Sequence, residues 1–289
     1  MIPKAFALPY YAPPAILPQN LPSQEEMCHS SEVYSETSGR KVVGVGPFFV
    51  AKYGLQVDLG EGRNIIYVAE HTSTPVPRVY ALFQDPESKR NFIIMERIHG
   101  QSLDKAWLTL TPSQKQEISG KLQTMVGLWR KAPSPGRFCN LDGLPLSDAL
   151  FWKGTGDDPF RNDEVYNDEE DLNKALIRNY ALNDHLRGKG KFYELAFPHI
   201  FRGHEPVFTH GDLQRKNVLV TTNSSTGEVV LTMIDWEFAG WYPSYWEFTK
   251  ALFACGRFED GWSHWLLQIL EPFWTEYSWL NTMMYELWG

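Results

Sequence analysis

Cysteine is scarce in this chain: three occur in 289 residues, at positions 28, 139 and 255. They are odd in number, far apart and without the spacing of metal ligands, so a disulfide framework or a cysteine metal site is excluded. We therefore expect reduced thiols in a cytosolic protein. Basic residues are also in deficit, because 27 Lys and Arg stand against 35 Asp and Glu, for a formal net charge of -8. A surface of this sign argues against nucleic acid as a partner.

Long hydrophobic runs are missing too. No apolar stretch reaches the roughly 18 residues that a membrane-spanning helix needs, so we expect no membrane partner. Prolines interrupt the apolar residues near the N-terminus, and no small-residue cleavage site follows a basic segment, which argues against a signal peptide. What is present is typical of a globular protein: 43% of the residues are hydrophobic and 21% are charged. The length suits one large domain or two lobes.

The most informative stretch is a polar loop that leads into a β-hairpin. His210 and Asp212 lie on the loop, and Asn217 closes it before an apolar run begins. Asn, Ser and Gly in residues 221–228 predict a turn, and a second β-rich run follows it. Such a hairpin brings Asn217 beside Asp235, so we expect Asp212, Asn217 and Asp235 to converge on one point.

This trio has the chemistry that phosphoryl transfer requires. One carboxylate orients the attacking hydroxyl, while an amide and a second carboxylate give Mg²⁺ the hard oxygen ligands that it prefers. The alternative interpretation is an ordinary polar loop in front of a hairpin.

The two halves of this stretch also carry a family resemblance. His210-Gly-Asp-Leu and Asn217, followed by Ile234-Asp-Trp-Glu237, resemble the aminoglycoside phosphotransferase and choline kinase group of small-molecule kinases, especially its large fungal set. Protein kinases have His-Arg-Asp and Asp-Phe-Gly at the corresponding places. The resemblance implies an α+β, protein kinase-like bilobal fold, with a small β-rich N-lobe and a larger, mainly helical C-lobe. We predict an N-terminal extended arm over residues 1–38, the N-lobe over 39–97, and the C-lobe with its catalytic loop over 98–289.

Lys52 is the candidate phosphate-binding residue of the N-lobe. It lies on the second strand of a hairpin predicted for residues 41–53, where an unpaired buried ammonium would be too costly. The obvious partner is Glu61, at the start of a helix predicted for residues 59–70. The resemblance implies that this pair holds the α- and β-phosphates of ATP. The alternative is an exposed lysine and a glutamate favoured by the helix dipole.

The other N-lobe predictions concern turns and strands. The glycine turn at 44–47 is a weak phosphate cradle; the resemblance implies that it overlies the triphosphate with few backbone donors. Residues 78–83 and 91–95 predict two more strands, which makes four in the N-lobe. The same resemblance implies that backbone groups near Glu96 and Ile98, in the connection that follows the last of these strands, bind adenine.

The C-lobe is predicted to be mostly helical. Thr111 is a good N-cap for a helix with Gln114 three residues on. Residues 241–257 and 262–288 are rich in aromatic and aliphatic side chains and are expected to be helices. Acidic residues gather between 157 and 171, at Asp157, Asp158, Asp163 and residues 168–171. Two interpretations stay open: the last four begin a helix whose dipole favours acids, or the cluster attracts a cationic substrate.

The predicted function is an ATP- and Mg²⁺-dependent transfer of the γ-phosphate to a hydroxyl of a small molecule, in the cytoplasm. Asp212 is the catalytic carboxylate, and Asn217 and Asp235, with Glu237 in the shell, are the metal ligands. His210 has a structural role in the family. The alternatives are a non-catalytic nucleotide-binding relative and a protein kinase. The latter is disfavoured because no Ala-Pro-Glu element follows Asp235.

Overall fold

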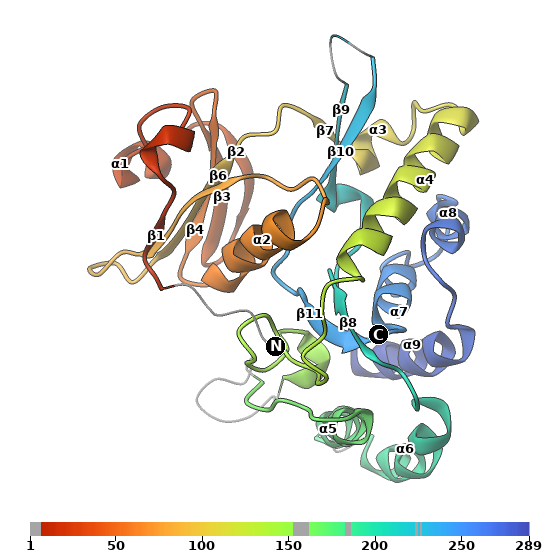
Figure 1. The fold of residues 1–289 in the computed structure, drawn as a ribbon. Coiled ribbons are helices and arrows are strands. Elements are labelled where there is room, and N and C mark those ends of the chain that lie inside the picture. Colours follow the sequence, from red (N-terminus) through yellow and green to blue (C-terminus); the bar gives the residue numbers. More distant parts are fainter. Residues whose placement is uncertain (1–6, 153–161, 183–185, 223–224, 226, 289) are drawn as a thin grey trace. The chain divides into compact units, whose positions relative to one another are not determined.

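The computed structural model describes residues 7–152, 162–182, 186–222, 225 and 227–288 (Figure 1). The described chain forms two compact units. The first, called here the β-rich unit, consists of residues up to 110 together with 215–237; the second, the helical unit, consists of 111–214 and 238 onward. The predicted boundaries at 38 and 97 stay a prediction about domains.

The β-rich unit is built on an antiparallel sheet with the strand order β1-β5-β6-β4-β3-β2. Its strands are β1 (Tyr10–Tyr11), β2 (Val33–Thr37), β3 (Arg40–Val45), β4 (Phe49–Gly54), β5 (Val79–Gln84) and β6 (Asn91–Glu96). The hairpin and the two later strands expected from the sequence are confirmed. The expectation of four strands is wrong for the described residues, because β1 and β2 also join the sheet.

These two added strands belong to the segment expected to be a loosely packed arm. The segment also holds the 3-10 helix η1 (Pro14–Ile16) and the helix α1 (Gln24–Cys28), which Ser23 and Glu26 cap reciprocally. Met27 of α1 is fully buried in the apolar core of the sheet, so the described part of the arm is integral to the unit.

Strand alternation decides what each face of β4 contacts. Phe49, Ala51 and Tyr53 point into the apolar core that also contains Met27. Successive side chains of a strand point to opposite faces, so Lys52 points to the other face. There α2 (Leu59–His71) packs against β5 and β6, and Asp58 caps its first turn by accepting from the Gly60 N–H at 2.8 Å. The predicted helix is confirmed.

A second, smaller sheet of the β-rich unit carries the predicted hairpin. Its strand order is β10-β9-β7, with β7 (Gln101–Ser102), β9 (Val218–Thr222) and β10 (Val229–Met233). The short helices α3 (Leu103–Ala106) and η3 (Arg215–Asn217) flank it. Val218 pairs with Met233, and the Ile234 N–H donates to the Asn217 carbonyl at 2.9 Å. Asn217 and Asp235 thus lie at the same end of the hairpin, as predicted.

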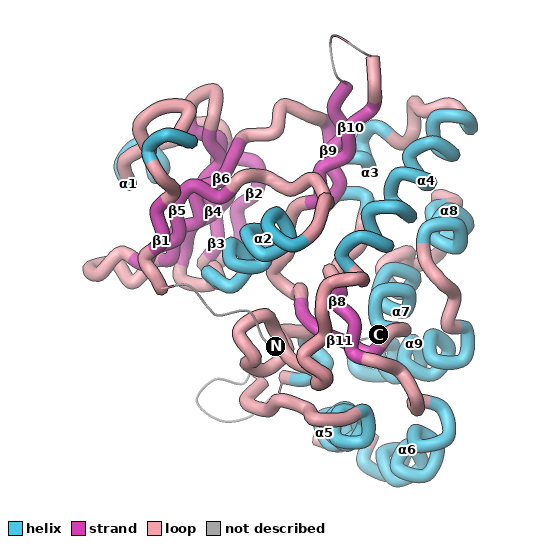
Figure 2. Tube along the Cα trace, in the orientation of Figure 1, coloured by secondary structure: helices cyan, strands magenta, loops and turns pink. Residues whose placement is uncertain are grey.

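The helical unit is mostly α-helix, as Figure 2 shows. Its elements are α4 (Pro112–Trp129), η2 (Ala149–Phe151), α5 (Glu169–Ala181), α6 (Arg187–Ile200), β8 (Pro206–Thr209), β11 (Gly240–Pro243), α7 (Trp246–Phe253), α8 (Trp262–Ile269) and α9 (Trp274–Trp288). Thr111 and Gln114 form the predicted capping box of α4. The prediction of helix from residue 241 is wrong at its start, because residues 240–243 pair as β11 with β8. Aromatic side chains suit a strand as well as a buried helix.

Two expectations about the whole chain concern thiols and membranes. Cys28, Cys139 and Cys255 are free cysteines, as expected from their number and spacing. Within the described ranges, no helix combines the length and apolar character needed to span a bilayer.

Candidate functional site

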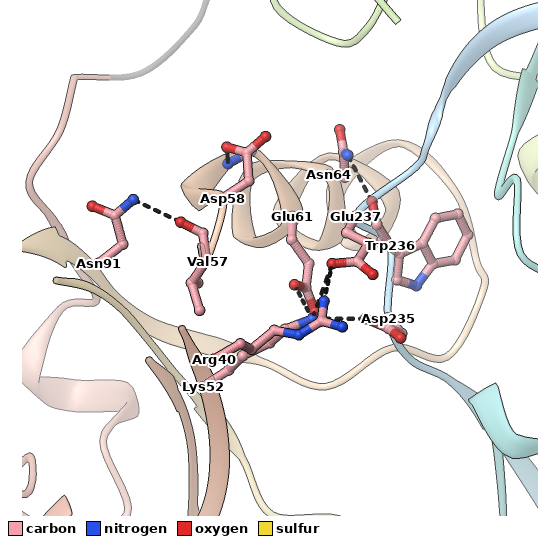
Figure 3. Close-up of polar contacts among 11 residues, drawn as sticks. Arg40, Lys52, Val57, Asp58, Glu61, Asn64, Asn91, Asp235, Trp236 and Glu237 are labelled. Carbon is pink, nitrogen blue, oxygen red and sulfur yellow. Dashed lines mark hydrogen bonds and ion pairs between the residues drawn. The ribbon is translucent and has the colours of Figure 1, made fainter. Parts of the chain in front are cut away.

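Lys52 is the centre of a cluster of charges in the β-rich unit (Figure 3). Its Nζ lies 2.5 Å from Oε2 of Glu61 on α2 and 2.7 Å from Oδ1 of Asp235. Oε2 of Glu237 is 3.6 Å away. The Lys52 and Glu61 side chains are only 6% and 3% exposed, so the pair expected from sequence exists and is buried.

Burial and charge shift the pKa values within this cluster. Burial alone would lower the pKa of Lys52, but Glu61, Asp235 and Glu237 outweigh it and raise that pKa. Burial raises the pKa of Glu61 to about 7, since Lys52 only partly offsets burial and the two nearby carboxylates. Lys52 is therefore held as a cation among three carboxylates, whose combined negative charge exceeds its own. Shifts of this kind, with specific partners, are frequent at functional sites.

Asp235 is held in an unusual backbone conformation. Its φ of 65° is in the left-handed region, which Asp tolerates better than most residues but which still costs energy. The peptide between Trp236 and Glu237 is fixed, because Nδ2 of Asn64 on α2 donates to the Trp236 carbonyl at 2.8 Å. Strain that the surroundings enforce in this way points to a functional constraint on Asp235.

The carboxylates could hold a metal ion. Oxygens of Glu61, Asp235 and Glu237 all lie within 4.8 Å of one another. The amide of Asn217, which is at the same end of the hairpin as Asp235, stays a predicted further oxygen donor for Mg²⁺. The donor set therefore fits a hard divalent cation. In the present arrangement the Lys52 ammonium contacts all three carboxylates.

Arg40 is a residue of this cluster that the sequence interpretation missed. Its Nη1 lies 2.5 Å from Oε2 of Glu237, the oxygen that also faces Lys52. No local pattern indicates this contact, because 197 residues separate the two partners along the chain.

The glycine turn at residues 44–47 lies at the end of β3 away from Arg40, and its place over a triphosphate stays a prediction. Glu237 contacts both Lys52 and Arg40, so Arg40 marks the position of the charged cluster on β3. Arg40 is the first residue of β3 and follows the turn at residues 38–39. The 44–47 turn is at the other end of β3, where the Gly46 carbonyl accepts from Arg97 at 2.8 Å. The turn beside the charged cluster is therefore residues 38–39, at the boundary predicted between the arm and the N-lobe.

The connection after β6 retains one backbone donor suited to adenine. The Glu96 N–H donates to the Arg78 carbonyl and the Arg97 N–H to the Phe48 carbonyl, both at 2.8 Å. Glu96 could therefore offer a base only its carbonyl. For the Ile98 N–H, the described residues show no hydrogen-bonded acceptor. Adenine binding by Glu96 and Ile98 stays a prediction.

The predicted catalytic loop lies in the helical unit, directly after β8. The Asp212 N–H donates to Nδ1 of the buried His210 at 3.1 Å, and Nε2 of Gln214 donates to Oδ1 of Asp212. Gly211 has a φ of +84°, and a Cβ there would lie 3.0 Å from Phe238. Glycine is thus required between His210 and Asp212.

Glu247 on α7 is the second residue that the sequence interpretation missed. It is fully buried, and its two carboxylate oxygens accept from the His210 N–H at 2.7 Å and the Gly211 N–H at 3.2 Å. Burial raises the pKa of this carboxyl, although His210, Arg130 and the two N–H groups oppose the shift. A signal was available, because a Glu between Trp246 and Phe248 is out of place in an apolar run. Asp212 belongs to the helical unit while Asn217 and Asp235 belong to the β-rich unit, so their convergence stays a prediction.

The acidic stretch divides between its two interpretations. Asp168 is the N-cap of α5 and accepts from the Asp171 N–H at 2.9 Å, so residues 168–171 do begin a helix. Glu164 pairs with Arg178 at 2.7 Å. Asp157 and Asp158 lie outside the described residues, so attraction of a cationic substrate there stays a prediction.

The model of a phosphotransferase enzyme family, APH, matches residues 59–280. The match includes Glu61, Asp212, Asn217 and Asp235, while Lys52 precedes it. A search of curated proteins finds no match.

Solved structures share the fold. The GDP complex of wild-type aminoglycoside 2'-phosphotransferase-IIIa has a TM-score of 0.56 at 15% identity, covering 87% of this chain and 80% of that one. A ternary complex of a thermostable mutant of the aminoglycoside phosphotransferase APH(4)-Ia with ADP and hygromycin B has a TM-score of 0.54 at 17% identity, covering 84% and 77%. At these identities the likeness shows the fold: an α+β, kinase-like arrangement of a β-rich region followed by a helical one.

Proposed function

The chain belongs to the phosphotransferase enzyme family, and from this premise we propose that it transfers the γ-phosphate of ATP to a hydroxyl of a small molecule. The proposal is supported by family membership and by the nucleotides, GDP and ADP, named in the complexes of structural relatives. GTP is the other nucleotide that the test includes.

The observation that carries the proposal is the buried Lys52 with its carboxylate partners. Removing an ammonium and a carboxylate from water costs roughly several kcal/mol for each ion. The attraction between the two charges often does no more than offset this cost. The Lys52–Glu61 contact of 2.5 Å is therefore poorly explained by stability alone. A lysine held at fixed position and fixed charge is what an incoming polyphosphate requires.

Each residue of the cluster has a role in this proposal. Glu61 orients Lys52, whose ammonium binds the phosphate oxygens. Asp235, Asn217 and Glu237 hold Mg²⁺, which when bound neutralises phosphate charge. The Ile98 N–H binds the base. The hairpin register and the Asn64 contact to the Trp236 carbonyl, which hold the backbone around Asp235, support these roles.

Asp212 orients the acceptor hydroxyl and takes its proton as the new bond forms. Gln214 donates to Oδ1 of its carboxylate, and the hydrogen bond of the Asp212 N–H to His210 holds the backbone that carries it. Positioning contributes more than basicity if the proton moves late. Glu247 holds the loop that presents this carboxylate.

The acceptor is proposed to be a small cationic molecule. The structural relatives include a complex with hygromycin B and one with kanamycin. The net charge of -8 favours the approach of a cation to this chain. The acceptor class is broad, and the candidates to be tested are aminoglycosides, choline and other amino alcohols.

The test is a panel of such acceptors assayed for phosphate transfer from ATP and GTP, with the product detected by mass spectrometry. Wild type is expected to phosphorylate at least one acceptor. Lys52→Met should abolish transfer, while Lys41→Met on the neighbouring strand, where the lysine pairs at 3.3 Å with the exposed Glu36, should not. Wild type that binds no nucleotide would contradict the proposal. Nucleotide binding without transfer to any acceptor would favour a non-catalytic binding protein.

A further inference from the structure

Arg40 is a second cation in the cluster around Lys52, and it comes from a different strand. It is the first residue of β3 and follows Gly39, whose φ of +83° makes the tight turn from β2. The Gln56 N–H donates to the Gly39 carbonyl at 3.0 Å, so the turn is tied to the end of β4. The Arg40 guanidinium is therefore presented by an anchored turn.

We propose that Arg40 is a second phosphate-binding residue of the nucleotide site, held in place by Glu237 until nucleotide arrives. The inference rests on the proposed function, because it concerns the same site. Its basis is the shared oxygen: Oε2 of Glu237 is 2.5 Å from the guanidinium and 3.6 Å from the Lys52 ammonium (Figure 3). Two cations thus converge on one carboxylate oxygen, from adjacent strands.

The two cations differ in their access to solvent. The Lys52 side chain is 6% exposed, whereas that of Arg40 is 33% exposed. A ligand can therefore reach the guanidinium without the rearrangement that Lys52 requires. The planar guanidinium also suits phosphate better than an ammonium does, because it can donate two parallel hydrogen bonds.

Arg40 can exchange its contact with Glu237 for a contact with a phosphate oxygen. An ion pair that is partly open to water contributes little to stability, so water and a phosphate oxygen can readily compete with Glu237 for the guanidinium. Glu237 is also one of the carboxylates suited to a divalent cation. If Glu237 held such a cation, its oxygens would no longer be available to the guanidinium, and a phosphate oxygen would be the replacement acceptor. The alternative is that Arg40 only neutralises Glu237. In that case its removal would not weaken the binding of phosphate-bearing ligands in particular.

Calorimetric binding of ATP and of adenosine, each with Mg²⁺, separates these two roles. Arg40→Gln is expected to weaken ATP binding about tenfold or more, the range of a charge-assisted hydrogen bond, and to leave adenosine binding unchanged. The matched control is Lys41→Gln, which removes the same charge one residue along β3 and should change neither affinity. Arg40→Lys keeps the charge without the fork, and an intermediate loss for ATP is expected. Weaker dependence of ATP affinity on salt in Arg40→Gln would be a further supporting result.

Three outcomes overturn the inference. If Arg40→Gln and Arg40→Lys bind ATP as wild type does, Arg40 does not bind phosphate. If ATP and adenosine weaken equally, Arg40 acts only by holding the local structure. If wild type itself binds neither ligand, the proposed function fails and the inference fails with it, an outcome distinguishable from the other two because it appears before any substitution is made.

Discussion

The Glu247 carboxylate accepts a hydrogen bond from the backbone N–H of His210 at 2.7 Å, so a helix of the helical unit holds the loop that carries Asp212. The same carboxylate accepts from the next N–H along the loop. A side chain that is fully buried and makes both contacts is a support of the loop's backbone.

Removing this support should destabilise the protein. Glu247→Ala leaves two buried N–H groups without their acceptor, at a cost of about 1–3 kcal/mol each, so a loss of about 3 kcal/mol in the free energy of unfolding is expected. Glu247→Gln keeps one acceptor oxygen and should lose less. Urea unfolding measures both. The control is Glu117→Ala on α4, where an exposed pair with Lys121 at 3.7 Å predicts a loss below about 0.5 kcal/mol. Equal losses at positions 247 and 117 would contradict the assigned role.

Asp235 can be tested with a substitution that respects its backbone. Asn tolerates a left-handed φ, unlike Ala, so Asp235→Asn removes the charge with little added strain. ATP with Mg²⁺ at 100 times its dissociation constant should stabilise wild type by about 2.7 kcal/mol, and most of this Mg²⁺-dependent gain should vanish in the variant. Thermal unfolding with and without Mg²⁺ gives the comparison.

A control for that charge change is Asp58→Asn at the N-cap of α2, because Asn caps helices as well as Asp does. This variant should keep the full gain on adding Mg²⁺ and ATP. The assignment of Asp235 as a metal ligand is lost if Asp235→Asn shows the wild-type gain.

His204 gives a pH dependence to the helical unit. Burial alone would lower its pKa, but Glu169, 2.5 Å from Nδ1, and Glu276, 3.3 Å from Nε2, raise that pKa above the ordinary 6.5. The folded state therefore keeps a proton that the unfolded state releases, and stability falls as pH rises from about 6.5 through the raised pKa. The excess stability of wild type over His204→Gln should be constant below pH 6.5 and shrink above it.

Urea unfolding of both proteins at intervals from pH 6 to pH 9 tests this. A difference that stays flat, or grows with pH, would show that the imidazolium is not what Glu169 and Glu276 stabilise.

Local pattern predicted the parts of this fold that depend on neighbours in sequence. β-branched runs around an Asn/Ser/Gly turn predicted the β9–β10 hairpin, and the cost of a buried ammonium predicted the contact of Lys52 with Glu61. The strand β2 was missed because all of its residues are exposed, so it has no alternating apolar pattern. Arg40 was missed because its partner is remote in sequence. The sequence also did not show which turn lies beside the charged cluster, because that depends on the pairing of β2 with β3, and β2 was not predicted.

The strand β11 was missed for another reason. Its aromatic residues are buried on both faces, and a short apolar run of this kind does not distinguish strand from helix. The meeting of Asp212 with Asn217 and Asp235 is a tertiary relationship that motif spacing predicts, and it is the part of the account that kinetics must decide.

Nucleotide binding and turnover measured together in Asp212→Asn distinguish a carboxylate that takes part in phosphate transfer from one that only supports the loop. Asn is nearly isosteric with Asp but cannot take the proton of the acceptor hydroxyl. Binding of ATP with Mg²⁺ should therefore match wild type, while kcat for the acceptor found by the panel should fall by about 10²–10⁴-fold. Turnover that survives the substitution at the wild-type rate would contradict the account.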